Sequence, residues 1–425
     1  MIGTRLTLEV GDIAHGGHAV ARHEGQVVFV RHALPGELVE AVVTKGKEGD
    51  RFVFADAVSV LTASPHRVEP RCPVSGPGGC GGCDFQHVDI AYQRELKGRV
   101  VTEQLQRLAG IEREVVVEAV PGGGQLDEGL RWRTRLELAV DRSGRAGLRR
   151  FRSREVVPLT DCPIAVEAVA GTGVFRRRWP GSKGVDVVVP SVGEPKVVPL
   201  PGGVKKAGFV TETVAVDTPA WAGDFRVPTR GFWQVHPGAA ATLVGAVLDG
   251  IRPEPGERCL DLYAGVGLFA AALADAVGAE GAVTAVESDE ASIAAAKRTF
   301  HATPQVRLVR ARTERALANL SGATGDSSDS SDGAGGADGA VEVVVLDPPR
   351  SGAGAEVIEA IAALSPRVVA YVACDPAALA RDLATAAASG YELAELRAFD
   401  LFPMTHHIEC VAILRPVAGG RSSIR

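Results

Sequence analysis

The sequence of 425 residues has no apolar run long enough to cross a membrane, and its start lacks the features of a secretory signal peptide. We therefore expect a cytoplasmic protein without a membrane partner. Disulfides are not expected either, because an odd number of cysteines without a signal peptide favours metal binding or catalysis. The seven cysteines are Cys72, Cys80, Cys83, Cys162, Cys259, Cys374 and Cys410. The length is sufficient for two or three domains.

An excess of positive charge, common in nucleic-acid-binding proteins, is also missing, since the formal net charge is −6 at pH 7. The basic residues are concentrated between Arg131 and Lys183, where thirteen Lys and Arg stand against five Asp and Glu. This distribution predicts a local phosphate-binding face, although charge alone fits a solvated surface equally well. Residues 131–140 alternate in polarity, which predicts a strand with one arginine face and with Trp132 nearby to stack on a base.

The pattern of residues 1–62 predicts short strands separated by turns, which is typical of a small barrel. The segment Gly11–Gly17, followed by Val27–Val30 and Ala33–Glu37, resembles a TRAM domain. TRAM domains are RNA-binding barrels attached to RNA-modifying enzymes, so the resemblance implies contact with RNA. The alternative is a barrel that serves only for packing.

The second expected domain, residues 63–230, begins with three cysteines in a glycine-rich loop. Glycine lets the backbone of Cys72, Cys80 and Cys83 fold closely around a metal. A fourth ligand is needed, and Cys162 is the candidate. Four cysteines suit zinc or an iron–sulfur cluster, and their spacing does not distinguish the two. The alternative is four free thiols.

The third expected domain, residues 231–425, has the strand–turn–helix pattern of an α/β fold. It lacks the three-glycine fingerprint of dinucleotide-binding proteins and has Asp261-x-Tyr263-x-Gly265-x-Gly267 instead. The following strand ends at Glu287, whose carboxylate can hold ribose hydroxyls. This combination indicates S-adenosylmethionine, and the alternative is a glycine turn without a ligand.

Three strand ends in this domain carry the residues that we expect to do chemistry. Asp347 follows one apolar strand, and Cys374 lies between another and a helix that begins at Pro376. A thiol at such a junction is placed where α/β enzymes bind ligands, although a buried structural cysteine is the alternative. Glu409 either reaches the same crevice or is a charge on an edge strand. Residues 321–340 lack periodicity and are predicted to be a flexible insertion.

Together and in this order, the motifs resemble the S-adenosylmethionine-dependent RNA uracil-5-methyltransferases over nearly the whole chain. The resemblance implies an α/β protein with an OB-like TRAM barrel, a central β-rich domain and a Rossmann-like methyltransferase domain. Cys374 would be the nucleophile and Glu409 the general base. The cofactor site would comprise Gln234, Tyr263, Gly265, Gly267, Glu287 and Asp347. A [4Fe–4S] cluster, rather than zinc, would be held by Cys72, Cys80, Cys83 and Cys162.

The chemistry of uracil supports these roles independently, because C5 is a weak nucleophile. Addition of a thiolate at C6 makes C5 reactive toward a methyl sulfonium, and a base must then remove the C5 proton. A base inside a helix is inaccessible to such groups, so the uridine has to be unpaired or flipped. The branch with both a TRAM domain and the cluster implies a monomer that acts on 23S ribosomal RNA.

Other functions remain open from the sequence: a tRNA uridine-54 methyltransferase, a 5-methylcytidine enzyme, a non-catalytic RNA-binding or assembly factor, and a redox-sensing iron–sulfur protein. Cytidine enzymes usually have a cysteine in the Asp347 motif, where this chain has Pro348 and Pro349. Three features depart from many relatives. Leu268 and Asp375 both stand where asparagine is usual, and seven residues rather than five separate the first two cysteines of the loop. The Asp375 carboxylate could raise the pKa of the neighbouring thiol.

Overall fold

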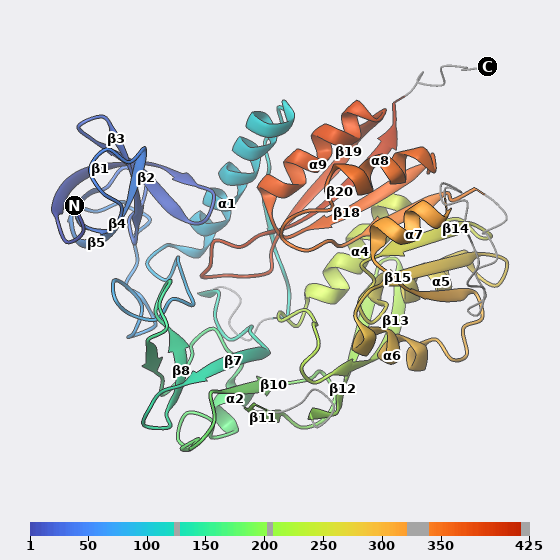
Figure 1. Ribbon diagram of the computed structural model, residues 1–425, viewed down its shortest axis with the longest axis horizontal. Helices are drawn as coiled ribbons and strands as arrows, with labels where there is room; N and C mark the ends of the chain where they lie inside the picture. Colours follow the sequence, from blue (N-terminus) through green and yellow to red (C-terminus); the bar gives the residue numbers. More distant parts are fainter. Residues whose placement is uncertain (123–127, 202–206, 321–339, 418–425) are drawn as a thin grey trace.

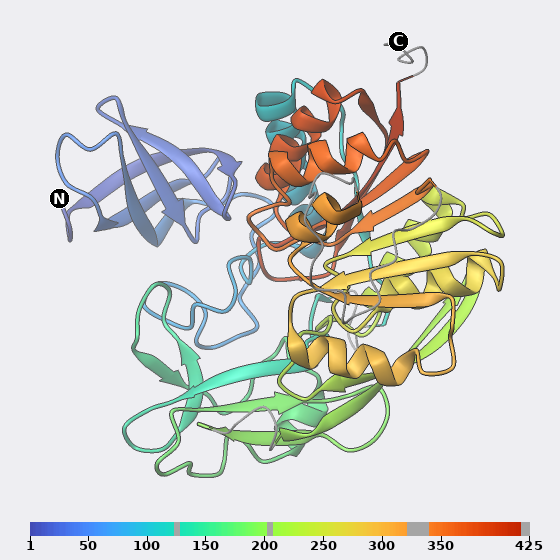
Figure 2. The same cartoon turned by 45° about the vertical axis from the view of Figure 1, so that its right-hand side comes forward.

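The computed structural model describes residues 1–122, 128–201, 207–320 and 340–417. Figure 1 shows a β-barrel at the N-terminal end, a group of central strands, and a C-terminal α/β domain on the other side. In the view of Figure 2, the barrel and the central strands are visible as two separate groups of strands. The predicted flexible insertion, apart from Ala340, lies outside the described residues. Among the helices that are described, none has the length and apolar character needed to span a membrane.

The N-terminal barrel is closed by five strands in the order β1-β2-β3-β5-β4. These strands are β1 (Arg5–Ala14), β2 (His18–His23), β3 (Gln26–Arg31), β4 (Leu38–Lys45) and β5 (Phe52–Thr62). Alternate side chains of β1, namely Leu6, Leu8 and Val10, fill its interior while their neighbours face water. The expected N-terminal barrel is confirmed.

Helix α1 (Ile90–Gln104) joins the barrel to the α/β domain. The Asp89 side chain caps its first turn by accepting from the N–H groups of Ala91 and Tyr92. The helix continues into a π-helical turn, η1 (Leu105–Ala109), which ends at a left-handed glycine. One face of α1 places Lys97 in a buried ion pair of 2.6 Å with Asp400 of the α/β domain.

The α/β domain is built on an eight-stranded sheet in the order β16-β15-β14-β17-β18-β20-β19-β6. Its strands are β6 (Val117–Ala119), β14 (Arg258–Leu262), β15 (Ala282–Glu287), β16 (Val306–Arg310), β17 (Val343–Leu346), β18 (Val368–Ala373), β19 (Tyr391–Asp400) and β20 (Glu409–Pro416). Its helices are α4 (Ala239–Ile251), α5 (Leu268–Val277), α6 (Glu290–Thr299), α7 (Thr313–Leu320), α8 (Ala355–Ala363) and α9 (Pro376–Ala388). Strand β20 runs antiparallel to both neighbours, so it starts at the edge where β14, β15, β17 and β18 end. That edge carries the site described below.

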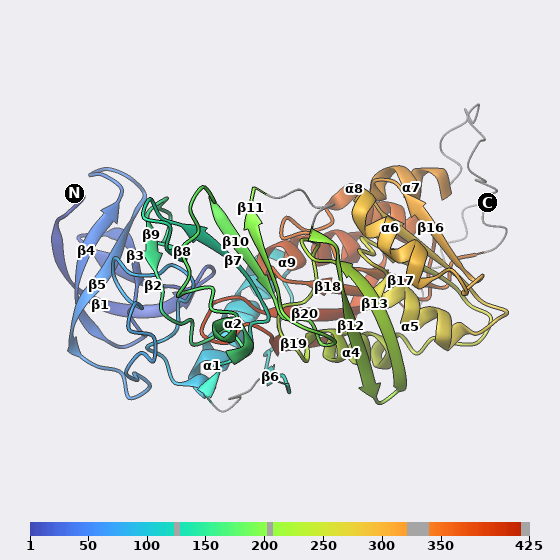
Figure 3. The same cartoon turned by 90° about the horizontal axis from the view of Figure 1, so that it is seen from below.

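The central part contains a five-stranded sheet and a separate hairpin, which Figure 3 shows from below. The sheet has β7 (Arg135–Val140), β8 (Ala146–Arg149), β9 (Val156–Pro158), β10 (Gly184–Val188) and β11 (Lys196–Leu200), with the short helix α2 (Glu167–Gly171) beside it. The hairpin of β12 (Phe209–Asp217) and β13 (Ala220–Pro228) packs into the core of the α/β domain through Phe225 and Val227. Because β6 also joins the large sheet, the division at residues 62 and 230 stays a prediction.

The predicted arginine strand of the central part is wrong in its length and in its role. Arg131 has a positive φ of 57°, which a strand does not accommodate, and the strand begins only at Arg135. The Arg131 side chain binds Asp161 at 2.7 Å, and Arg135 is buried against Glu212 at 2.8 Å. Trp132 is 1% exposed, so it packs in the core and presents no face to a base.

Apart from Arg133, which is half-buried and donates to the carbonyl of Arg135, the remaining arginines of the basic region stay at the surface. The exposed ones are Arg142, Arg145, Arg149, Arg150, Arg152, Arg154, Arg176, Arg177 and Arg178. The predicted phosphate-binding face therefore has to come from these side chains, on the turns around β8 and β9 and after α2, and not from the strand β7.

Candidate active site

The thiol of Cys374 and the carboxyl group of Glu409 are brought together by strand register. In the antiparallel pair β18–β20, the last registered partners are Ala373 and Cys410; Cys374 follows β18 directly, and Glu409 is the first residue of β20. The charge of Glu409 acts on the Cys374 thiol, second only to burial in raising its pKa, so the two groups lie near each other. Glu409 is 3% exposed and lies on a strand between two others, which excludes the edge-strand interpretation.

Asp347 and Arg350 approach the same pair from the end of β17, the neighbour of β18. Asp347 follows the strand directly, and its N–H donates to the carbonyl of Leu262 at the end of β14. Arg350 lines one pocket with Cys374, and its Nη2 lies 3.4 Å from Nε2 of His407. The sequence marked Arg350 as part of a motif but gave it no role.

Desolvation raises the pKa of each acid at this site. The pKa of Cys374 rises to about 12, through burial first and the charge of Glu409 second, and Arg350 offsets part of this. Burial and then the charge of Asp347 raise the pKa of Glu409, and Arg350 again acts in the opposite direction. Burial raises the pKa of Asp347 to about 7. Burial therefore favours the protonated form of each group, and a cation that enters the site would favour release of the protons.

The glycine turn between β14 and α5 has the backbone shape that a closely held ligand needs. Tyr263, Gly265 and Gly267 have positive φ values of 63°, 57° and 92°. A Cβ on Gly267 would fall on the ring of Phe300, so glycine is required there. The N–H of Gly265 donates to Oε2 of Glu287 at 2.9 Å, which joins the ends of β14 and β15. Four of the predicted cofactor residues therefore lie together at one edge of the sheet.

Asp261 supports this turn from below, a role that the sequence motif contained but did not reveal. Its Oδ2 accepts from the N–H of Ala270 at 2.8 Å and so ties β14 to α5. Its Oδ1 is buried without a hydrogen-bond partner in the described part of the chain. Burial raises the pKa of Asp261 to about 8.

Gln234, the remaining predicted cofactor residue, lies in the loop between β13 and α4 and is 9% exposed. The loop is held in place on both sides. Trp233 packs in the core of the α/β domain, and the carbonyl of Val235 accepts from the N–H of Thr134 at 2.8 Å. The contact of Gln234 with a cofactor stays a prediction.

The four predicted cluster ligands line one cavity, although they are not arranged as a metal site. Cys72, Cys80, Cys83 and Cys162 all face this cavity, next to Arg133 and Asp161. Within the described ranges, no three His, Cys, Asp or Glu side chains form a group that could hold a metal ion. Two polar groups point to sulfur: the N–H of Gly82 lies 3.4 Å from Sγ of Cys80, and Nε2 of Gln86 lies 3.5 Å from Sγ of Cys83.

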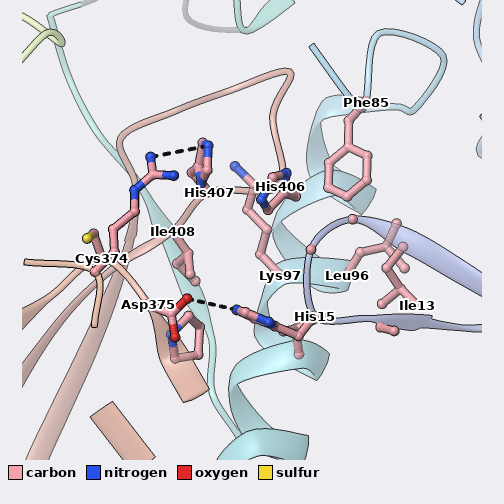
Figure 4. Close-up of a pocket in the computed structure, with 16 residues that line it drawn as sticks. Ile13, His15, Phe85, Leu96, Lys97, Cys374, Asp375, His406, His407 and Ile408 are labelled. Carbon is pink, nitrogen blue, oxygen red and sulfur yellow. Dashed lines mark hydrogen bonds and ion pairs between the residues drawn. The ribbon is translucent and has the colours of Figure 1, made fainter. Parts of the chain in front are cut away.

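The barrel contributes to the pocket around Cys374, which no local sequence pattern could have indicated. The turn between β1 and β2 places His15 beside Asp375, as Figure 4 shows, with Nε2 and Oδ2 3.1 Å apart. His406 and His407 form the opposite wall, and His406 is fixed by Asp84 at 2.6 Å.

Comparison with known proteins identifies the family to which the chain belongs. A model of tRNA (uracil-5-)-methyltransferases matches residues 204–417, and a TRAM domain model matches residues 1–58. A methyltransferase sheet and an RNA-binding barrel together define an RNA-modifying enzyme. The chain belongs to the tRNA (uracil-5-)-methyltransferase family and is an S-adenosylmethionine-dependent RNA uracil-5-methyltransferase.

The relatives differ in the RNA that their names specify. An uncharacterized RNA methyltransferase of Streptomyces avermitilis is 46% identical over 99% of this chain and 100% of its own length. The 23S rRNA (uracil(1939)-C(5))-methyltransferase RlmD of a Shewanella strain is 30% identical over 97% of this chain and 96% of its own. The fold matches that of a Pyrococcus abyssi tRNA (uracil-54, C5)-methyltransferase in complex with S-adenosyl-L-homocysteine, with a TM-score of 0.64, 22% identity, and coverage of 96% and 99%.

Proposed function

We propose that this enzyme transfers a methyl group from S-adenosylmethionine to C5 of a uridine in 23S ribosomal RNA. The observation that carries the proposal is the proximity of Cys374, directly after β18, to Glu409 at the start of β20, with Asp347 at the end of the adjacent strand. The choice of RNA is supported by the 30% identity to the 23S rRNA enzyme over almost the full length of both chains. The tRNA enzyme matches at 22%, which supports only the fold.

The reaction needs one sulfur anion and one proton acceptor on the same base. The Cys374 thiolate adds to C6 of uracil, and the C5–C6 π electrons move onto C5 and the C4 oxygen. C5 then takes the methyl group that S-adenosylmethionine supplies, and the sulfonium electron pair stays on sulfur. Glu409 accepts the C5 proton, the C5–C6 double bond forms again, and the thiolate leaves.

The raised pKa of Glu409 is suited to this step, because a carboxylate held in an apolar site is a stronger base than one in water. The same burial makes ionisation costly before the substrates bind. Arg350 lowers the pKa of both Cys374 and Glu409, and the sulfonium adds a second positive charge when the cofactor is present. Substrate binding and activation of the thiol are therefore linked.

The cofactor would bind along the glycine turn. Gly265 and Gly267 let it approach the backbone, Tyr263 flanks it, and Glu287 accepts from the ribose hydroxyls in place of its bond to Gly265. Gln234 and Asp347 would complete the pocket on the side of the target base. The exposed arginines of the central part and the barrel would hold the RNA backbone.

We also propose that the four-cysteine cavity holds a [4Fe–4S] cluster rather than zinc. Cysteine sulfur is the usual ligand of such clusters, and N–H groups that point to sulfur, as at Cys80 and Cys83, stabilise the charge on the sulfur. The cluster would be held by Cys72, Cys80 and Cys83 of the loop together with Cys162 on the other side of the cavity. The cluster would serve as a crosslink in the fold.

Purified enzyme incubated with labelled S-adenosylmethionine and 23S rRNA should place label at uridine C5. Cys374→Ala should abolish turnover and keep cofactor affinity, whereas Cys410→Ala, a neighbouring buried thiol on the opposite face of β20, should stay active. Glu409→Gln should still form and methylate the adduct but fail to release it, giving a protein–RNA complex that survives denaturant. Label in tRNA or cytidine, an active Cys374→Ala, or bound cofactor without any transfer would each contradict the proposal; the last would favour an assembly factor.

A further inference from the structure

The turn between β1 and β2 connects the barrel to the residue next to the nucleophile. His15 extends from this turn toward Asp375 in Figure 4, with Nε2 3.1 Å from Oδ2. The side chains are 39% and 24% exposed, so the pair lies at the rim of the pocket and not in its interior. The two residues are 360 positions apart in the sequence, so their contact depends on how the barrel packs against the pocket.

The β1–β2 turn is fixed in position by contacts on both sides of His15. Ile13 is buried among Phe85, Leu96 and their neighbours at the start of α1. Gly17 has a φ of +76°, and a Cβ there would lie 2.6 Å from Cβ of His406. The turn therefore touches the wall of the pocket so closely that only glycine fits. A barrel that moved away would remove His15 and Gly17 from the pocket together.

Asp375 uses its two carboxylate oxygens for two different purposes. Oδ1 accepts from the N–H of Ala378 at 2.8 Å and caps α9, and Oδ2 is left for His15. The pKa of Cys374 is raised first by burial and then by Glu409, and the charge of an ionised Asp375 at the adjacent position adds a smaller contribution in the same direction. A protonated His15 offsets that charge.

The charge state of His15 is set mainly by this partner. The pKa of His15 is raised, first by the hydrogen bond to Asp375, and burial opposes the rise. The other charged groups that face it are Arg381 of α9, which lowers its pKa, and Glu103 of α1, which raises it. A group with a raised pKa carries its charge below that pKa and loses it as the pH rises.

We propose that His15, which the barrel supplies, is a positioning residue for the nucleophile. It neutralises the charge of Asp375, so formation of the Cys374 thiolate depends on contact between the barrel and the pocket. The inference rests on the proposed role of Cys374. It gives the barrel a part in catalysis in addition to RNA binding, and it explains how the chain tolerates aspartate where many relatives have asparagine. His15 itself does not contact the base.

The test measures the alkylation rate of Cys374 by iodoacetamide in the full-length protein, followed by mass spectrometry of the peptide that contains it. His15→Ala and His15→Gln should both lower the rate roughly three- to tenfold near pH 7, equivalent to about half to one pKa unit. His15→Gln keeps a hydrogen-bond donor for Asp375 but carries no positive charge. It therefore tests the charge even if His15→Ala has a folding defect. His23→Ala, at the other end of β2, is the matched control and should match the wild type.

The second part of the test removes the anion. Asp375→Asn should restore the alkylation rate of His15→Ala to within about twofold of wild type, and kcat for RNA methylation should follow with KM unchanged. The difference between wild type and His15→Ala should shrink as the pH rises through the His15 pKa. Wild-type reactivity in His15→Gln, equal losses with and without Asp375→Asn, or a loss independent of pH would overturn the inference. Alkylation does not require methyl transfer, so an active Cys374→Ala would refute the proposed function separately.

Discussion

At the scale of single residues, the site is an acid cluster that depends on Arg350. Cys374, Glu409 and Asp347 each carry a raised pKa, and the charges of the two carboxyl groups add to the burial of the thiol. Arg350 opposes this for both the nucleophile and the base. Its guanidinium is held near them by His407, and this contact comes from the loop before β20. The residue therefore sets how readily the site loses its protons.

Replacing Arg350 with glutamine should raise the pKa of Cys374 and slow the reaction. We expect kcat/KM to fall about tenfold or more near neutral pH, with the acidic limb of the pH–rate profile displaced to higher pH by about one unit. Arg350→Lys keeps the charge and should recover part of the rate. The measurement is the methylation rate over a pH series, and an Arg350→Gln profile that superimposes on the wild type would contradict this role.

The positions of residues were predictable where they depended on local pattern. The apolar run before Cys374 and the proline after it indicate a strand that ends at a helix, and both were found. His15 could not be predicted, because its partner is 360 residues away and no periodicity connects them. Trp132 was misjudged because alternation continues through residues 131–134, before the strand begins, and burial cannot be read from such a pattern.

At the scale of elements, the β18–β20 ladder positions the reacting groups, whereas the β14–α5 turn shapes the predicted cofactor site. The ladder fixes the reacting groups by register, and a shift of one residue would turn Glu409 away from Cys374. The sequence predicts each strand but not their register, because β20 pairs with β18 across the intervening α9 and β19. The turn, in contrast, was predicted from its glycines alone, since its shape is a local property of the backbone.

A methyl group at Gly267 should specifically damage cofactor binding. Gly267→Ala has to relieve both a φ of 92° and a clash with Phe300, so the turn must shift. We expect affinity for S-adenosylmethionine, measured by calorimetry, to fall about tenfold or more. Gly278→Ala is the matched control, because Gly278 ends the same helix with a φ of 68° and open space around it. Equal cofactor affinity in the two variants would contradict the role of Gly267 in the cofactor turn.

At the scale of the whole molecule, the active site lies where separate parts of the chain meet. Asp84 and Phe85 both donate their N–H groups to the carbonyl of Met404, immediately before the pocket histidines. Asp84 follows Cys83, so the cysteine loop is connected through two residues to the wall of the pocket. The general architecture was predictable from composition and motif order. The way that the barrel and the cysteine loop close the pocket was not, because it depends on contacts between distant segments.

An iron–sulfur cluster in the four-cysteine cavity should therefore affect the Cys374 pocket. It should also colour the protein. Anaerobic preparation should give brown protein with about four irons, and Cys83→Ser should lose them, whereas Cys259→Ser, in the distant strand β14, should keep them. Because the loop that follows Cys83 holds Met404, loss of the cluster should also lower the unfolding temperature and weaken RNA methylation, with cofactor affinity nearly unchanged. Colourless protein with one zinc would contradict the cluster assignment, and Cys83→Ser with full stability and activity would contradict the connection to the pocket.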